Sequence, residues 1–292
     1  MKSPKKLSAC LGVLVLICFG FHGTVFAADA DKCTAITSVP FTISASGSYC
    51  LANDISTPAT FTAGNAITVS VNDVVIDLGG FTLGNLSAGT GTQAVGIFAQ
   101  DQKNVTVQNG TVRGFCRGID LLDSGTVALV ASRGHLVENV RVDMSRCLGI
   151  VVEGTSSVIR NNQVVGTGTK DSAIGIYAVG IGVHVLDNEV ADTFRPSGLG
   201  NGYGIFIDTL GTGAVIEGNV ISNDPSDFGL GSGSIGILAN ATDVLVVNNR
   251  LTWLNFGIFY ASGGNGKFRD NLTSGVTTAY RFLGGTDAGN NN

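Results

Sequence analysis

The chain of 292 residues carries 17 lysines and arginines against 22 aspartates and glutamates, a net charge of −5 at pH 7. This balance argues against nucleic acid or an anionic membrane surface as a general partner. With 42 glycines and only 13% charged residues, the composition is typical of many short strands joined by turns and disfavours long amphipathic helices.

The first residues predict an export signal. Three lysines within the first six residues precede an apolar run, Leu11–Phe21, and Val25–Ala27 supplies a small-residue cleavage site. We expect residues 1–27 to be a cleaved signal peptide and the mature protein to be secreted or periplasmic. Removal of the signal leaves 14 basic against 22 acidic residues, a net charge of −8. No later segment resembles a membrane span.

Four cysteines follow the signal, an even number that suits disulfides in an oxidising compartment. Cys33 and Cys50 flank one short segment, where a bridge would contribute about 3 kcal/mol by closing a loop. The alternative is four free, buried thiols. A zinc site would need paired cysteines at CxxC spacing, which the sequence does not contain. Residues 28–65 are expected to form an N-terminal cap and the first strands.

A glycine followed by isoleucine then recurs along the chain, in segments such as VGIF, IGIY and FGIF. The glycines stand at positions 96, 118, 149, 175, 204, 236 and 257. The gaps between them vary from 21 to 32 residues. Such a repeat indicates a solenoid in which each unit is one coil with a loop of variable length.

Each coil carries a second signal, in which alternating apolar residues are interrupted by two turn-forming positions. The first position reads Asn109, Asn139, Asn161, Asp187, Gly218, Asn248 and Asp270. The second reads Gly110, Val140, Asn162, Asn188, Asn219, Asn249 and Asn271. These residue types tolerate a left-handed backbone, and stacked asparagine amides can bond between coils. We predict a structural turn ladder of Asn109, Asn139, Asn161, Asn162, Asn188, Asn219, Asn249 and Asn271.

With these two signals the chain resembles the right-handed parallel β-helix family, the pectate-lyase-like proteins that include pectate lyases, polygalacturonases and alginate epimerases. The resemblance covers about residues 66–282, and PFTISASGSYCLANDI, from Pro40, is similar to the segment that commonly begins such proteins. It implies an all-β fold, a single-stranded solenoid of about eight coils over residues 66–283, with a flexible tail at 284–292. A β-sandwich would not repeat both signals in the same order.

The two remaining cysteines agree with this alignment. Cys116 lies two residues before one repeated glycine, and Cys147 lies two residues before the next. The two cysteines should therefore occupy the same angular position on adjacent coils, close enough to bridge or to stack.

Strand alternation places the isoleucine of each Gly-Ile signal inside the coil and the next residue outside. The outward column reads Phe98, Asp120, Val151, Tyr177, Phe206, Leu238, Phe259 and Arg281. Two positions further on, the outward residues are Gln100, Leu122, Glu153, Val179, Asp208, Asn240 and Ala261. Phe98, Tyr177, Phe206 and Phe259 are candidate ligand-binding residues that could stack on sugar rings. Loops could instead cover this stripe, or it could contact another protein.

The candidate catalytic residues are Asp120, Glu153, Arg117 and Arg146. An arginine can neutralise a uronate while a carboxylate takes the adjacent proton, but a solvated face of mixed charge has the same composition. The paired aspartates of polygalacturonases are missing. No metal-ligand set or cofactor is indicated; calcium is possible, but no residue pattern points to it. His135 is expected on the surface of a strand, and Arg160, beside the ladder, is a further candidate for a charged patch.

Three functions remain open from the sequence. The first is an exported protein that binds carbohydrate or a cell-envelope partner along its exposed side without catalysis. The second is a polysaccharide lyase, hydrolase or epimerase that acts on an anionic polysaccharide. The third is a structural or assembly protein whose aromatic stripe is an oligomer contact. The sequence does not decide whether the protein is an enzyme, nor its oligomeric state.

Overall fold

The computed structural model describes residues 33–125, 131–168, 173–193, 201–226 and 233–292. The predicted signal at residues 1–27 lies outside these residues. Cys33–Asn292 is a single unit in which almost every regular element is a strand, and the one helix described is a 3-10 turn, η2 (Leu86–Ala88). The described part of the chain contains no helix long and apolar enough to cross a membrane.

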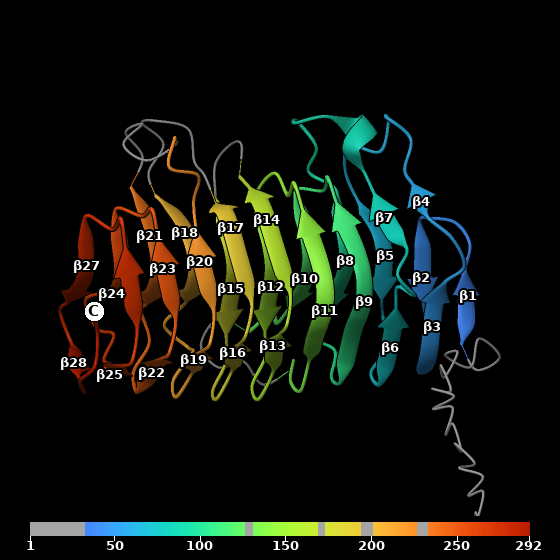
Figure 1. Ribbon diagram of the computed structural model, residues 1–292. Helices are drawn as coiled ribbons and strands as arrows, with labels where there is room; N and C mark the ends of the chain where they lie inside the picture. Colours follow the sequence, from blue (N-terminus) through green and yellow to red (C-terminus); the bar gives the residue numbers. More distant parts are fainter. Residues whose placement is uncertain (1–32, 126–130, 169–172, 194–200, 227–232) are drawn as a thin grey trace, which may run out of the picture. The chain divides into compact units, whose positions relative to one another are not determined.

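The chain winds through three faces in every coil, so that equivalent strands stack side by side (Figure 1). The first face is a ten-stranded sheet in which every pairing is parallel. Its strands are β2 (Phe41–Ile43), β5 (Asn65–Val69), β8 (Val95–Gln100), β10 (Arg117–Leu122), β12 (Leu148–Glu153), β15 (Ile174–Val179), β18 (Gly202–Ile207), β21 (Ser234–Ala239), β24 (Phe256–Tyr260) and β27 (Thr278–Phe282).

The second and third faces belong to one 18-stranded sheet that bends at a corner. The second face holds β1 (Thr34–Ile36), β3 (Gly47–Leu51), β6 (Val74–Asp77), β13 (Val158–Arg160), β16 (His184–Leu186), β19 (Val215–Glu217), β22 (Val244–Val247), β25 (Gly266–Arg269) and β28 (Gly285–Asp287). The third face holds β4 (Ile55–Ser56), β7 (Thr82–Gly84), β14 (Gln163–Thr167), β17 (Glu189–Thr193), β20 (Val220–Ser222), β23 (Arg250–Thr252) and β26 (Leu272–Ser274). Two longer strands, β9 (Val105–Arg113) and β11 (Leu136–Asp143), pass through the corner and serve both faces.

The predicted inward phase of the isoleucines is confirmed. Seven stacked isoleucines have no exposed surface and line the first face from inside: Ile97, Ile119, Ile150, Ile176, Ile205, Ile237 and Ile258. Because each isoleucine packs over the same residue type in the next coil, the interior is a continuous apolar column.

The repeated glycines mark a place where adjacent coils approach too closely for a side chain. A Cβ atom added at Gly118 would lie 2.8 Å from the carbonyl oxygen of Gly149, and one at Gly175 would lie 2.7 Å from that of Gly204. The whole glycine column shows the same approach to the following coil. Ala279 stands at its end, on the last strand of the first face, where no described coil follows.

The two turn-forming columns have different roles. Residues of the first column, from Asn109 to Asp270, have φ between 53° and 71°, so they supply the left-handed bend between the second and third faces. Residues of the second column from Asn162 onward are buried and bonded to one another. For example, the Asn162 backbone N–H and side-chain amide both donate to Asn188 Oδ1 at 3.0 Å.

The ladder of asparagine-to-asparagine bonds between coils therefore begins later in the chain than predicted and continues further towards the C-terminus. Asn109, Asn139 and Asn161 belong to the left-handed turn column and lie outside the run of asparagine-to-asparagine bonds, while Asn109 Nδ2 donates to Asp77 Oδ2 of the preceding coil at 3.0 Å. The rungs are Asn162, Asn188, Asn219, Asn249, Asn271 and also Asn291. At the other end the ladder stops at Val140, which has no side-chain amide and whose backbone N–H donates to Asn162 Oδ1.

The stack extends further at both ends than the eight predicted coils. Within the proposed cap, β2 pairs with β5 and β1 pairs with β3, so these residues already lie in register with the coils. At the other end, the residues predicted as a flexible tail contain β28, which pairs with β25, and the final rung of the ladder. Repeat signals miss these coils because Ala66 and Ala279 stand where the other coils have glycine.

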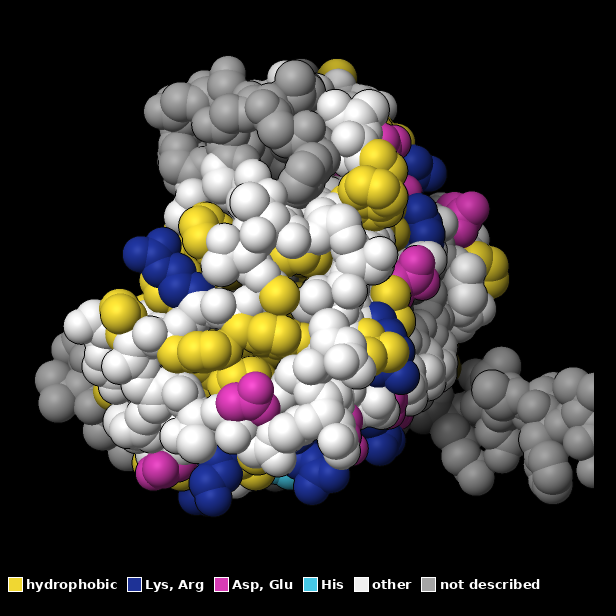
Figure 2. All heavy atoms as spheres, turned by 60° about the vertical axis from the view of Figure 1, so that its left-hand side comes forward, with side chains coloured by type: hydrophobic (Ala, Val, Ile, Leu, Met, Phe, Trp, Pro, Cys, Tyr) yellow, Lys and Arg dark blue, Asp and Glu magenta, His cyan; other side chains and the backbone are white. Residues whose placement is uncertain are grey.

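Aromatic rings close the C-terminal end of the stack. Phe268 is fully buried, and its ring lies 4.5 Å from that of Phe282 and 5.3 Å from that of Tyr280. Seen from this end, hydrophobic side chains gather on the surface (Figure 2), where Phe282 and Leu283 are 40% and 63% exposed. The rings shield the interior column at the last described coil.

Both cysteine pairs are bonded. Cys33–Cys50 links β3 to the segment that precedes β1, with Cα atoms 5.8 Å apart. Cys116–Cys147 joins adjacent coils just before β10 and β12, with Cα atoms 4.8 Å apart, as the repeat alignment requires. The second bridge ties the N-terminal edges of two strands that carry candidate site residues.

Substitution of Gly175 by alanine should lower the free energy of unfolding by about 2 kcal/mol or more, because the new methyl group must push two coils apart. Urea denaturation checks this. The matched control is Gly91→Ala, where an added Cβ meets nothing within 4 Å and the change should stay within about 0.5 kcal/mol. Equal stabilities for Gly175→Ala and the wild type would contradict the close-approach explanation.

Candidate functional site

The outer side of the first face presents three stacked columns. The central column holds the predicted outward residues in the predicted register, from Phe98 to Arg281. The trailing column, two positions later, contains Glu153, Asp208 and Asn240. A leading column, formed by the residue before each glycine, was not singled out from the sequence and reads Val95, Arg117, Leu148, Ile174, Tyr203, Ile235, Phe256 and Thr278.

The aromatic rings of the outer side form two clusters. Tyr177 meets Phe206 edge to face at 5.4 Å between ring centroids, and Tyr203 lies 5.3 Å from Phe206. Further along, Phe256 and Phe259 lie 6.2 Å apart. These five rings are partly exposed and combine residues of the leading and central columns.

Within the predicted stripe, Phe98 stands apart from these clusters and Phe259 is partly covered. Phe98 is separated from Tyr177 by Asp120 and Val151 in the central column, so it does not join the other rings. The guanidinium of Arg281 covers Phe259 at 4.8 Å from the ring centroid, which leaves less of that ring free.

Asp120 lies in the central column and has no exposed surface. Its Oδ2 accepts a hydrogen bond from Arg117 Nη1 at 2.8 Å, whereas its Oδ1 has no partner. Burial raises the pKa of the Asp120 carboxyl, and the bond to Arg117 lowers it in part. Arg117 thus neutralises the Asp120 carboxylate, and Asp120 Oδ1 keeps its capacity to accept a hydrogen bond.

Glu153 stands at the C-terminal end of β12, diagonally across from Asp120, and is partly exposed. Its Oε2 accepts the backbone N–H of Asp123 at 3.2 Å. Burial raises the pKa of Glu153, and the negative charges of Asp120 and Asp123 raise it further. Glu153 is therefore an accessible carboxyl that holds its proton more readily than an ordinary glutamate does.

Two coils further on, Asp208 is held by neighbouring side chains. The hydroxyl of Tyr177 donates to Asp208 Oδ2 at 2.6 Å, and Asn240 Nδ2 donates to Oδ1 at 3.3 Å. Burial, and then the bond to Asp208, raises the pKa of Tyr177. Tyr177 consequently keeps its proton and acts as a hydrogen-bond donor, with Asp208 as the charged acceptor.

Arg146 does not join this cluster. It precedes β12 at the corner beside Phe115, whose carbonyl accepts its backbone N–H, whereas Glu153 lies at the opposite end of the same strand. The structure thus brings together three of the four predicted catalytic residues and adds Tyr177, Asp208 and Asn240. Arg160 lies on the second face, away from this cluster, and its guanidinium forms an ion pair with Glu138 at 2.8 Å.

His135 is buried, contrary to the expectation of a surface position. It is 2% exposed, and its Nδ1 accepts the backbone N–H of Val105 at 3.3 Å. The hydrogen is therefore on Nε2, which donates to Ser132 Oγ at 2.6 Å. In this tautomer the imidazole cannot take a proton from Ser132, so the histidine does not activate the serine as a nucleophile. The hydrogen bond between the two side chains has a structural role. The repeat carries no signal for this burial, because Ser132, the hydrogen-bond partner of His135, lies outside the repeated strands.

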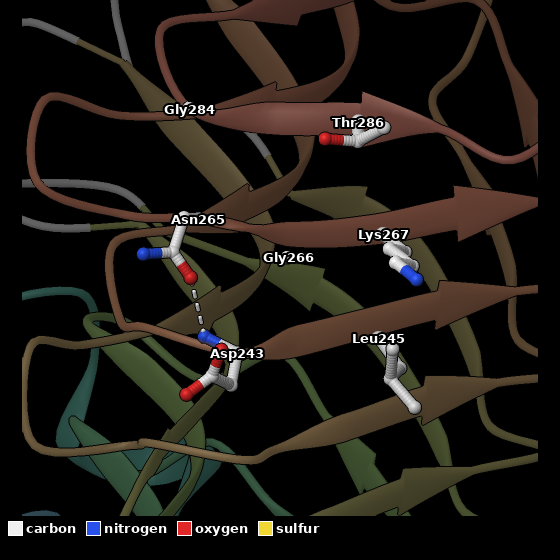
Figure 3. A pocket seen from close by; sticks show the side chains of 7 residues that line it. All are labelled: Asp243, Leu245, Asn265, Gly266, Lys267, Gly284 and Thr286. Atoms are coloured by element: carbon white, nitrogen blue, oxygen red, sulfur yellow. Dashed lines mark hydrogen bonds between the residues drawn. The ribbon is translucent and has the colours of Figure 1, made fainter.

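Metal ligands do not converge anywhere in the described residues: no group of three or more histidine, cysteine, aspartate or glutamate side chains is arranged to hold an ion. A hollow of about 390 Å³ lies instead on the second face, lined by Asp243, Leu245, Asn265, Gly266, Lys267, Gly284 and Thr286 (Figure 3). It is shallow, and Leu245, Lys267 and Thr286 stand on successive strands without converging on one point. The outer side of the first face therefore remains the best candidate site.

No family model matches the chain, and no curated protein matches it. Solved structures do match. Dettilon tailspike protein superposes with a TM-score of 0.56 at 14% identity, over 82% of this chain and 46% of its own. The enzymatically active domain of tailspike protein 2 from bacteriophage CBA120 gives a TM-score of 0.56 at 15% identity, over 90% of this chain and 42% of its own.

The protein is a right-handed parallel β-helix. The resemblance drawn from the sequence repeats is thereby confirmed at the level of the fold. The β-helix spans less than half the length of each tailspike protein that it matches. At these identities the likeness establishes the fold, and the function has to be argued from the outer side of the first face.

The β-helix should lose stability in mild acid through His135. Burial lowers the pKa of His135 from about 6.5 to about 4. Between these pH values the unfolded chain binds a proton at this histidine and the folded protein does not. The stability that depends on a neutral His135 is fully present above pH 6.5 and is lost as the pH falls towards 4. Between pH 7.5 and 4.5, the wild type should lose about 2 to 3 kcal/mol relative to His135→Gln, measured by urea denaturation. Parallel pH profiles for the two proteins would contradict this assignment.

Proposed function

We propose that the protein binds a polysaccharide along the outer side of the first face, over β12, β15, β18 and β24. The observation that carries the proposal is the row of hydrogen-bonding groups, Glu153, Tyr177, Asp208 and Asn240, directly beside the rings of Phe206 and Tyr203. Sugars need both, because their C–H faces pack on aromatic rings while their hydroxyls pair with polar groups.

The fold makes this arrangement rigid. All of these residues except Asp208 and Asn240 lie within strands, and those two directly follow the ends of β18 and β21. Parallel strands space successive side chains of a column by about 4.8 Å, so the columns offer regularly repeated contacts to a chain of repeated units. A ligand that follows the stack would meet its partners already in place and lose little binding energy to ordering them.

Two further observations support an exported polysaccharide-binding protein. The disulfides Cys33–Cys50 and Cys116–Cys147 suit an oxidising compartment. One of the solved structures that the chain resembles is an enzymatically active tailspike domain built on the same fold. We propose, as the sequence predicts, that the mature protein works outside the cytoplasm.

A second candidate function is hydrolysis of the bound polysaccharide, favoured by the raised pKa of Glu153. Glycoside hydrolysis uses one protonated carboxyl as acid and one carboxylate. Glu153 and Asp208 lie two coils apart, about 10 Å between their Cα atoms at the usual strand spacing. Carboxyl groups on such backbones can reach the separation of about 6.5 to 9.5 Å that inverting hydrolases use.

Replacement of Phe206 by alanine should weaken polysaccharide binding at least tenfold, because the change removes the ring shared by the Tyr177 and Tyr203 contacts. A glycan array with the wild-type protein identifies a ligand, and titration calorimetry compares the variants. Trp253→Ala is the matched aromatic control, since Trp253 is 43% exposed but lies just after β23 on the third face. Equal loss in both variants would contradict the proposed face.

The same ligand distinguishes binding from hydrolysis. If the β-helix hydrolyses it, new reducing ends should accumulate with the wild type and not with Glu153→Gln, while Glu153→Gln still binds. Absence of reducing ends at saturating ligand would rule out the second candidate and leave the binding proposal standing.

A further inference from the structure

We infer that the polysaccharide bound on the outer side of the first face is uncharged, without uronate or other acidic groups over β12 to β21. This inference rests on the proposed function and specifies its ligand class. It replaces the anionic polysaccharide that the arginine-rich middle of the sequence suggested. It rests on the hydrogen bonds and ion pairs of the described ionisable groups on this face.

The described cation that is bonded to the acidic groups of this face, Arg117, is already engaged. Arg117 Nη1 donates to Asp120 Oδ2 at 2.8 Å, so its charge balances a carboxylate with no exposed surface. Recruiting Arg117 to a ligand carboxylate would leave Asp120 buried without its counter-charge, which is strongly unfavourable. At the far end of the face, Arg281 of β27 lies over the rings of Phe256 and Phe259.

The remaining polar groups are mostly acceptors. Glu153 and Asp208 present carboxyl oxygens on the partly exposed side of this face, whereas Asp120 has no exposed surface. A sugar hydroxyl can donate to Glu153 or Asp208, whereas a uronate carboxylate can only accept. An acidic sugar over β12 to β18 would therefore place a like charge next to Glu153 and Asp208 and would find few donors.

Substitutes for a basic residue are also missing from the described part of this face. Uronate chemistry in proteins relies on arginine or on a bound metal to neutralise the carboxylate. No described group of side chains is arranged to hold a metal ion. Removal of a proton beside a uronate, the step shared by lyases and epimerases, therefore has no support here, whereas hydrolysis needs only the acid and carboxylate already described.

The inference is tested with sugars that differ only in oxidation at C6. Oligomers of galactose and galacturonate, of mannose and mannuronate, and of glucose and glucuronate form three matched pairs. Titration calorimetry at low and moderate salt should show at least tenfold tighter binding of the neutral member in the pair that the protein recognises. The affinity for the neutral oligomer should change less than twofold with salt, because no net charge is exchanged.

Variants separate the charge argument from general loss of binding. In Glu153→Gln combined with Asp208→Asn, removal of the two carboxylates should narrow the preference for the neutral oligomer to less than threefold. Glu217→Gln, an exposed position on the second face, should retain the full preference. Circular dichroism melting confirms that each variant is folded before it is titrated.

The outcomes are distinct. Tighter binding of a uronate oligomer, lost in Phe206→Ala, would overturn the uncharged ligand and leave the proposed binding face in place. An unchanged preference in the double variant would also overturn the inference, because the carboxylates would not cause it. Failure to bind any oligomer or any glycan on the array would overturn the proposed function itself, and this inference with it.

Discussion

The close stacking of successive coils is the constraint on which the rest of the structure depends. Backbones in the first face approach so closely that a Cβ atom added to a glycine of the repeat would lie only 2.4 to 2.8 Å from a carbonyl oxygen of the following coil. This approach fixes the register of every strand, since a shift by one residue would put the inward isoleucine outside. Apolar burial then follows, because each isoleucine meets another at the same place in the next coil.

The asparagine ladder meets a different requirement at the corner between the second and third faces. A bend of this kind leaves backbone amides without strand partners, and burying them unpaired would cost about 1 to 3 kcal/mol each. The side chain of each rung accepts such an amide from the coil before it, as Asn219 does for Asn188 at 2.9 Å. The polar column inside an apolar solenoid is therefore a consequence of the bend, and it is separate from any ligand site.

Function is left to the outer columns, because the interior is filled. The register places Asp120, Glu153 and Asp208 on one side, with rings of neighbouring coils beside them. Their bonding decides their chemistry more than their residue type does. Asp120 is neutralised by Arg117, Asp208 is held by Tyr177, and Glu153 retains a raised pKa and access to solvent.

The sequence predicts what repeats and fails where a residue depends on a single loop or end. The inward isoleucines, the central column and the Cys116–Cys147 pairing follow from one alignment, because every coil obeys the same spacing. The burial of His135 and the position of Arg146 depend on irregular connections that no repeat describes. Tyr203 was missed although its column repeats, because the residue type before each glycine varies from valine to arginine.

The central claim is that fixed coil-to-coil bonding, running through both the sheets and the ladder, sets the positions of the outer columns. Amide hydrogen exchange measures it most directly. We predict that the backbone amides of Asn162, Asn188 and Asn219, which donate to side chains of the next coil, exchange as slowly as those of Ile176 and Ile205 in the first face. Exchange at the rate of exposed turns would show that the ladder does not hold the coils together and would contradict the account.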